Sequence, residues 1–141
     1  MRDVPARFLL RGTIVTAPMK GWLGLTRHFG LVTHQRGADG MPVMVANSMA
    51  SGGPAEESWD KFTEGKGLHT GAYYPSAREP DAVLANAYRL FGTRYHLLKW
   101  NCEHFVNVCH GLPAKSRQVG QAQQFAMAAI VGGIALAASR I

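Results

Sequence analysis

Three short segments in the first third of the chain combine β-branched and apolar residues and end at turn-forming residues. They cover residues 12–18, 29–33 and 42–47. Such runs are typical of β-strands when Gly, Pro, Asn or Asp bounds them. Between the second and third runs, residues 36–40 read Arg-Gly-Ala-Asp-Gly, which favours a chain reversal. The pattern therefore predicts three strands, with a hairpin-like connection between the last two.

Two later segments show the periodicity of helices that bury one face. The first begins at Asp81 and stops at Gly92, and its apolar positions at helical spacing are Val83, Ala87, Leu90 and Phe91. The second covers residues 102–110, and its apolar face at i, i+3, i+4 and i+7 consists of Cys102, Phe105, Val106 and Cys109. Residues 95–98, between the two helices, favour a short strand or an extended lead-in.

The stretch from residue 51 to residue 80 shows neither a strand-like pattern nor the periodicity of a helix. It opens with Ser-Gly-Gly-Pro, holds an apolar island at residues 59–62 and continues through the glycine-containing residues 65–71. We therefore expect a long loop, and a loop of this length in a compact domain is usually functional or mobile.

An uninterrupted apolar run covers residues 125–138 near the C-terminus. As a helix it reaches roughly 21 Å at about 1.5 Å per residue, short of the ~30 Å hydrocarbon core of a bilayer. Two interpretations stay open: a helix that is buried or packed on a partner, and a membrane anchor of marginal length. We expect one globular domain over residues 1–120 and this apolar C-terminal helix over residues 121–141.

Composition narrows the class of protein. A chain of 141 residues with 47% hydrophobic content matches one globular domain. The formal net charge of +6 favours anionic surfaces such as phospholipid headgroups. The basic residues are scattered and form no stripe with aromatic residues, so we do not expect nucleic-acid binding. No secretory signal peptide is visible, and we expect a reducing, cytoplasmic location, with membrane association in the case that the C-terminal helix is an anchor.

Cys102 is the candidate nucleophile. It is expected at the N-terminus of its helix, where the helix dipole favours a thiolate, and it begins the apolar face. Its helical spacing from Cys109 is about two turns, too far for a disulfide. An inward-pointing cysteine is more often structural, so the residue pattern alone leaves both roles open.

A base for this thiol has to come from another segment. His28 opens an apolar strand and is the better candidate, because His104 follows Cys102 too closely on the helix to reach it. Asn47, at the end of the next predicted strand, is a candidate for the third residue that orients the base. His34 ranks second for that role, since it points to the same side of the strand but roughly 20 Å along it. Structural roles for these residues stay open at this point.

Metal binding is the competing use of the same residue types. The potential donors include His28, His34, His69, Cys102, His104, Cys109 and His110. No Cys-x-x-Cys or His-x-x-x-His pair occurs among them, so we expect no metal site.

Residues 95–107 read Tyr-His-Leu-Leu-Lys-Trp-Asn-Cys-Glu-His-Phe-Val-Asn. They closely resemble the signature of the lecithin retinol acyltransferase-like family, whose core is Asn-Cys-Glu-His-Phe. The matching frame extends to residues 12–15, 27–32 and 116–119, and the apolar tail lies where some relatives carry a membrane helix. The resemblance covers roughly two thirds of the chain and leaves residues 48–80 without a clear counterpart.

This resemblance implies an α+β fold, with a small antiparallel sheet packed on helices, similar to the circularly permuted papain-like folds of the NlpC-type superfamily. It implies that Cys102 attacks an ester carbonyl to form a thioester, that His28 moves the proton, and that water or a second acceptor takes the acyl group. No cofactor is implied. Relatives often carry a second histidine where this chain has Asn47, and Glu103 and His104 match the motif without an assigned chemical role.

We therefore expect a phospholipase or acyltransferase that acts on phospholipids or other acyl esters at a membrane surface. The alternative is a cysteine peptidase or amidase of the NlpC type, because a thiolate does not by itself select esters over amides. A non-catalytic adaptor that retains the fold is the third hypothesis. The oligomeric state is not indicated by the sequence.

Overall fold

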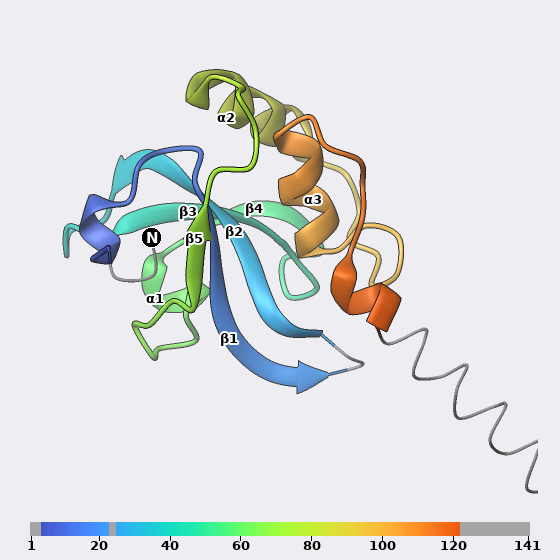
Figure 1. Cartoon of the computed structure of the whole chain (residues 1–141). Helices are drawn as coiled ribbons and strands as arrows, with labels where there is room; N and C mark the ends of the chain where they lie inside the picture. Colours follow the sequence, from blue (N-terminus) through green and yellow to red (C-terminus); the bar gives the residue numbers. More distant parts are fainter. Residues whose placement is uncertain (1–3, 23–24, 122–141) are drawn as a thin grey trace, which may run out of the picture.

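The computed structural model describes residues 4–22 and 25–121 and builds them around a five-stranded antiparallel sheet (Figure 1). The strands lie in the order β4-β3-β2-β1-β5. Their bounds are β1 (Ile14–Trp22), β2 (Leu25–Arg36), β3 (Pro42–Ser48), β4 (Gly53–Glu57) and β5 (Gly71–Tyr73). The helices are η1 (Ala6–Phe8), α1 (Trp59–Phe62), α2 (Pro80–Arg89) and α3 (Cys102–Cys109). The expected α+β class with a small antiparallel sheet is confirmed.

The three predicted strands are confirmed as parts of β1, β2 and β3. The connection between β2 and β3 is the expected reversal, closed by a 2.9 Å hydrogen bond from the Gly37 N–H to the Met41 carbonyl oxygen. Gly40 has a φ of 79°, which a residue without a Cβ adopts at no steric cost. β1 and β2 run beyond the predicted segments, because paired backbones extend through residues whose side chains carry little β-preference.

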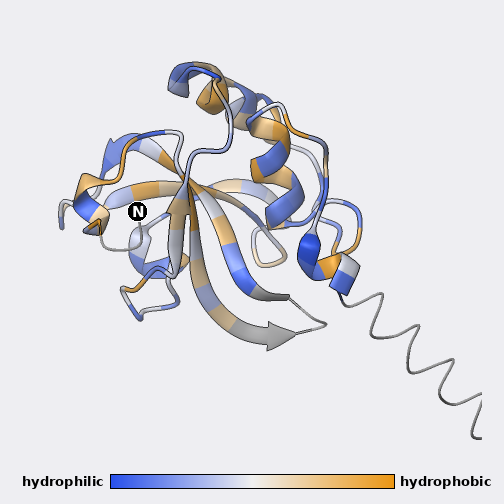
Figure 2. Cartoon of the chain, in the orientation of Figure 1, coloured by the Kyte–Doolittle hydropathy of each residue, from blue (hydrophilic) through white to orange (hydrophobic). Residues whose placement is uncertain are grey.

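The central strands carry many hydrophobic residues (Figure 2), and their alternate side chains contribute to two separate cores, one on each face of the sheet. Leu31 of β2 packs in the cluster that contains Phe105 of α3, together with residues of α2. Its neighbour Val32 packs on the opposite face, in the cluster that contains Phe62 of α1. Each fully buried side chain of this size stabilises the fold by about 1.5–3 kcal/mol. The sheet is therefore held between α2 and α3 on one face and α1 on the other.

The prediction of a long loop over residues 51–80 is wrong, because the segment contains β4, α1 and β5. β4 reads Gly-Pro-Ala-Glu-Glu, a composition that strands ordinarily avoid. It forms because its backbone pairs with β3, with Asn47 opposite Pro54 and Met44 opposite Glu57. Pro54 is tolerated there because β4 is an edge strand. α1 has only four residues and shows no full helical period.

Both predicted helices are confirmed near their expected bounds. α2 begins at Pro80, one residue before the expected start, and Gly92 follows its end with a φ of 92°. The prediction of a short strand or extended lead-in at residues 95–98 is wrong. The chain turns there, and an isolated bridge between His96 and Trp100 closes the turn. The apolar run at residues 125–138 lies outside the described residues. Within residues 4–22 and 25–121, no helix is long and apolar enough to cross a membrane.

Candidate active site

The local sequence around Cys102 explains why α3 begins there. The Asn101 side-chain oxygen accepts hydrogen bonds from the backbone N–H groups of Glu103 at 3.0 Å and His104 at 3.2 Å. The His104 Nδ1 atom in turn accepts the Asn101 N–H at 2.9 Å. This reciprocal capping box fixes the helix start, and such caps stabilise by about 1 kcal/mol. Cys102 therefore lies in the first helical turn, and it is only 3% exposed.

Glu103 is buried and ties the segment after α3 to the helix. One of its oxygens accepts the Ser116 hydroxyl at 3.0 Å, and the other accepts the backbone N–H of Arg117 at 3.1 Å. The backbone N–H of Gln118 lies 3.5 Å from the first of these oxygens. Glu103 and His104 thus hold the helix in place, consistent with the absence of an assigned chemical role for either.

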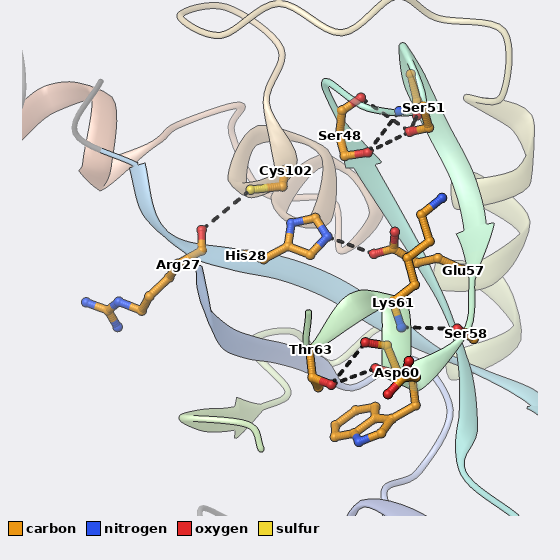
Figure 3. A network of polar contacts seen from close by, with 12 residues as sticks. Arg27, His28, Ser48, Ser51, Glu57, Ser58, Asp60, Lys61, Thr63 and Cys102 are labelled. Carbon is orange, nitrogen blue, oxygen red and sulfur yellow. Dashed lines mark hydrogen bonds and ion pairs between the residues drawn. The ribbon is translucent and has the colours of Figure 1, made fainter. Parts of the chain in front are cut away.

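The structure brings His28 of β2 against Cys102, although the two residues are far apart in the sequence (Figure 3). Both side chains line the same pocket, and the interaction with Cys102 is among the causes that raise the pKa of His28. The Cys102 Sγ atom lies 3.9 Å from the backbone oxygen of Arg27, the residue that precedes His28. The imidazole also packs against Phe62, with ring centroids 4.8 Å apart. β2 therefore carries the candidate base directly to the N-terminus of α3.

Glu57 is the residue that contacts the other end of the imidazole. Its Oε1 atom lies 2.7 Å from His28 Nε2, and both side chains are largely buried. The His28 ring therefore lies between the thiol and a carboxylate (Figure 3). Sequence reasoning missed Glu57, because it ends β4 within the segment interpreted as a loop. Glu57 is brought to the site by the pairing of residues 53–57 with β3. No pattern in the sequence indicates that pairing.

Asn47 lies in the same region but makes different contacts from those expected. Its Nδ2 atom donates to the carbonyl oxygens of Trp100 at 2.9 Å and Asn101 at 3.3 Å. It is completely buried, and it connects β3 to the two residues that precede Cys102. Glu57, and not Asn47, is thus the hydrogen-bond partner of His28. His34 is exposed farther along β2 and does not line the Cys102 pocket.

Two opposing effects set the protonation of His28. Burial disfavours the charged ring and lowers its pKa. The hydrogen bonds to Cys102 and Glu57, and the negative charges of both groups, outweigh burial and raise the pKa of His28 from 6.5 to about 9. The imidazole is therefore protonated at neutral pH, poised between two acidic groups.

Cys102, His28 and Glu57 line a pocket of about 420 Å³. Tyr95 also lines it, and burial together with the negative charge of Cys102 raises the Tyr95 pKa to about 12, so the phenol keeps its proton. Most of the exposed surface of the pocket is apolar, and its remaining lining residues are the apolar Met19, Met49 and Ala50 and the polar Asn47, Ser48, Lys61 and Glu64. The arrangement can hold an apolar chain next to the thiol.

Cys109 provides an internal contrast to Cys102. Both cysteines are free and buried, but Cys109 lies in the core at the far end of α3. Burial raises the pKa of its thiol to about 12, which keeps it protonated. His110, beside it, is held between the Ser76 hydroxyl and the Gly12 carbonyl oxygen. Across the described part of the chain, no group of three or more His, Cys, Asp and Glu side chains is placed to hold a metal ion.

Comparison with known proteins gives one family match. The family model described as lecithin retinol acyltransferase matches residues 28–112, more than half of the chain, from the candidate base to just beyond α3. No curated protein and no solved structure matches the chain. The matched range contains Cys102, His28 and Glu57. The chain therefore belongs to the lecithin retinol acyltransferase family.

Proposed function

We propose that this protein transfers or hydrolyses the acyl groups of lipid esters through a thioester on Cys102. Family membership indicates an enzyme of the acyltransferase or phospholipase type in general terms. The observation that carries the specific proposal is that Cys102 and His28, whose pKa is raised to about 9, line the same largely apolar pocket. A neighbouring imidazolium and a helix N-terminus both favour a thiolate, the form that attacks carbonyl carbon.

In the first step the Cys102 thiolate attacks the ester carbonyl carbon. An S–C bond forms, and the carbonyl π electrons move to the oxygen. Asn101 Oδ1 accepts hydrogen bonds from the backbone N–H groups of Glu103 and His104. Within the described residues, the Cys102 N–H donates no hydrogen bond. This N–H is available to stabilise the oxyanion.

In the second step the tetrahedral intermediate collapses and the C–O bond to the alcohol breaks. Glu57 occupies Nε2 of His28, so Nδ1 is the nitrogen that delivers the proton to the leaving alkoxide. Neutral His28 then accepts a proton from water or a second acceptor, which attacks the thioester and releases the free thiolate. Glu57 is a positioning residue that fixes the ring and stabilises its charged form.

Asn47 serves this mechanism indirectly. By holding the carbonyl groups of Trp100 and Asn101, it fixes the backbone that presents Cys102 to His28. The order of a histidine strand followed by a cysteine helix fits a circularly permuted papain-like arrangement. The formal charge of +6 supports work at an anionic membrane surface on the cytoplasmic side, with phospholipid as the acyl donor.

The experiment is intact-protein mass spectrometry after incubation with mixed phospholipid vesicles. We expect a mass increase equal to one fatty acyl group in the wild type. The adduct should be absent in Cys102→Ala and retained in Cys109→Ala, whose thiol lies in the core and away from the pocket.

Two outcomes would overturn the lipid proposal. In the first, no adduct forms although the Cys102 thiol still reacts with iodoacetamide. This outcome would favour the alternative, cleavage of amide bonds by the same residues. A thiol that is inert to iodoacetamide at neutral pH would indicate a non-catalytic role.

A further inference from the structure

A second and larger cavity lies beside the Cys102 pocket and shares no lining residue with it. Its volume is about 740 Å³, and strands β1, β2 and β5, helix α3 and the segment after α3 contribute to its walls. Consecutive residues of β2 line the two cavities, Arg27 the larger one and His28 the other. The proposed thioester chemistry does not use the larger cavity.

The charge of this cavity is predominantly positive. Arg27, Lys115 and Arg117 line it, and within the described residues none of these three forms a salt bridge. Glu103 is the acidic residue of the lining. Its oxygens already accept the Ser116 hydroxyl and the Arg117 and Gln118 N–H groups, so it is committed to holding the chain after α3. In the described part of the chain, three cations therefore line a cavity whose single carboxylate, that of Glu103, already accepts hydrogen bonds from the segment after α3.

Two of these cations, Arg27 and Arg117, influence the pKa of the same side chain, Tyr73. Tyr73 lines the cavity, and burial first, then the charge of Glu103, raises the pKa of its phenol. The charges of Arg117 and Arg27 oppose that shift. The two guanidinium groups come from different parts of the chain, one from β2 and one from the segment after α3. Both guanidinium groups line the cavity and lie within electrostatic range of the same phenol.

The remaining walls combine apolar with uncharged polar side chains. Phe29 of β2 lines the cavity with 6% of its surface exposed. Leu112 and Pro113 contribute from the segment after α3. A site that combines two guanidinium groups with apolar surface suits a ligand with a phosphate at one end and a hydrocarbon portion at the other, since arginine binds phosphate with paired hydrogen bonds.

We propose that this cavity binds the phosphate group of an anionic amphiphile, with Arg27 and Arg117 on the phosphate and Phe29 and Tyr73 against its apolar portion. The site is distinct from the thiol pocket. Arg27 extends its side chain away from Cys102 while its backbone oxygen faces the sulfur (Figure 3). Gln118 fixes that backbone, accepting the Arg27 N–H at 2.9 Å and donating to its oxygen at 3.3 Å. Binding here requires no reaction at Cys102.

The test is isothermal titration calorimetry on the full-length Cys102→Ala protein, which cannot turn the probe over by the proposed route. The probes are monomeric dihexanoyl phosphatidic acid, inorganic phosphate, and dihexanoylglycerol as the analogue without phosphate. The variant is Lys115→Gln/Arg117→Gln, in which both side chains are exposed and the neighbouring hydrogen bonds use backbone atoms. The matched control is Lys66→Gln/Arg94→Gln, which also removes two exposed cations but none from either cavity.

We expect phosphatidic acid to bind more tightly than inorganic phosphate, and dihexanoylglycerol to give no binding at this site. The Kd for phosphatidic acid should rise about tenfold or more in Lys115→Gln/Arg117→Gln and stay within about twofold in the control. Equal binding to both double variants would overturn the proposal and indicate the thiol pocket or general charge as the site. Inorganic phosphate could instead bind as tightly as phosphatidic acid and lose as much affinity in Lys115→Gln/Arg117→Gln. That result would show that the cavity binds free phosphate, and it would overturn the proposal of an amphiphilic ligand. Circular dichroism establishes that each variant is folded.

Discussion

The Oε1 atom of Glu57 lies 2.7 Å from Nε2 of His28, a contact that joins the end of β4 to β2. In the proposed mechanism this carboxylate orients the ring and stabilises its protonated form. Strands β4 and β2 are separated by β3 in the sheet, so the contact spans a full strand.

Replacing Glu57 by Gln removes the charge that stabilises the imidazolium while retaining the size of the side chain. We expect kcat to fall on the order of 10–100-fold, part of the 10²–10⁴-fold that acid–base catalysis contributes. The alkaline limb of the pH–rate profile should also move to lower pH, since the pKa of His28 loses one of its raising causes. Glu56→Gln is the control, because Glu56 contacts Tyr88 and not His28. An unchanged alkaline limb in Glu57→Gln would contradict the positioning role.

In the wild type we expect activity to decline as the pH rises through about 9, the pKa of His28. Above that value the ring no longer carries the proton that the leaving alkoxide needs. The same group links folding to pH. Its folded-state pKa lies above the ordinary 6.5, so its stabilisation is fully present below about 6.5 and is lost as the pH rises through about 9. Measurements of kcat/KM and of urea unfolding across neutral and alkaline pH check both expectations.

Asn47→Ala removes the donor that holds the Trp100 and Asn101 carbonyl groups. The two carbonyl oxygens keep the backbone N–H groups of His96 and Phe105 as partners, so the variant loses two hydrogen bonds at about 0.5–1.5 kcal/mol each. We expect the free energy of unfolding to fall by about 1–3 kcal/mol. The rate should fall because Cys102 is less well fixed, while the alkaline limb of the pH profile stays in place. A displaced limb would indicate instead that Asn47 acts on His28. Urea unfolding and the pH–rate profile measure the two effects separately.

Gly30 of β2 lies beneath the Phe62 ring, which also contacts His28. A Cβ at position 30 would lie 2.7 Å from Phe62 Cε2, so the ring would have to move. We expect Gly30→Ala to destabilise the protein by about 1–3 kcal/mol, as overpacked cores do. Gly120→Ala is the control, because a Cβ there meets nothing within 4 Å. Equal thermal midpoints for the two variants would contradict this account.

The sequence predicts those parts of the fold in which a residue pattern and a local structure coincide. The apolar period of α3 and the β-rich start of β2 are visible in the sequence, and they locate Cys102 and His28 on the correct elements. Glu57 could not be found in this way, because Gly-Pro-Ala-Glu-Glu becomes a strand only through its pairing with β3. Asn47 was placed in the correct neighbourhood, but its partners are backbone carbonyl groups, which carry no residue-specific signal.

The position of β4 at the edge of the sheet has a thermal consequence. Within the described residues no strand pairs with its outer side, so its backbone is held to the sheet by β3 alone. Outer strands are among the segments that open locally before a domain unfolds as a whole. Fraying of β4 would carry Glu57 away from His28 while the central strands and the two cores persist. We therefore expect heat to inactivate the enzyme reversibly at temperatures where most of its backbone amides still resist hydrogen exchange.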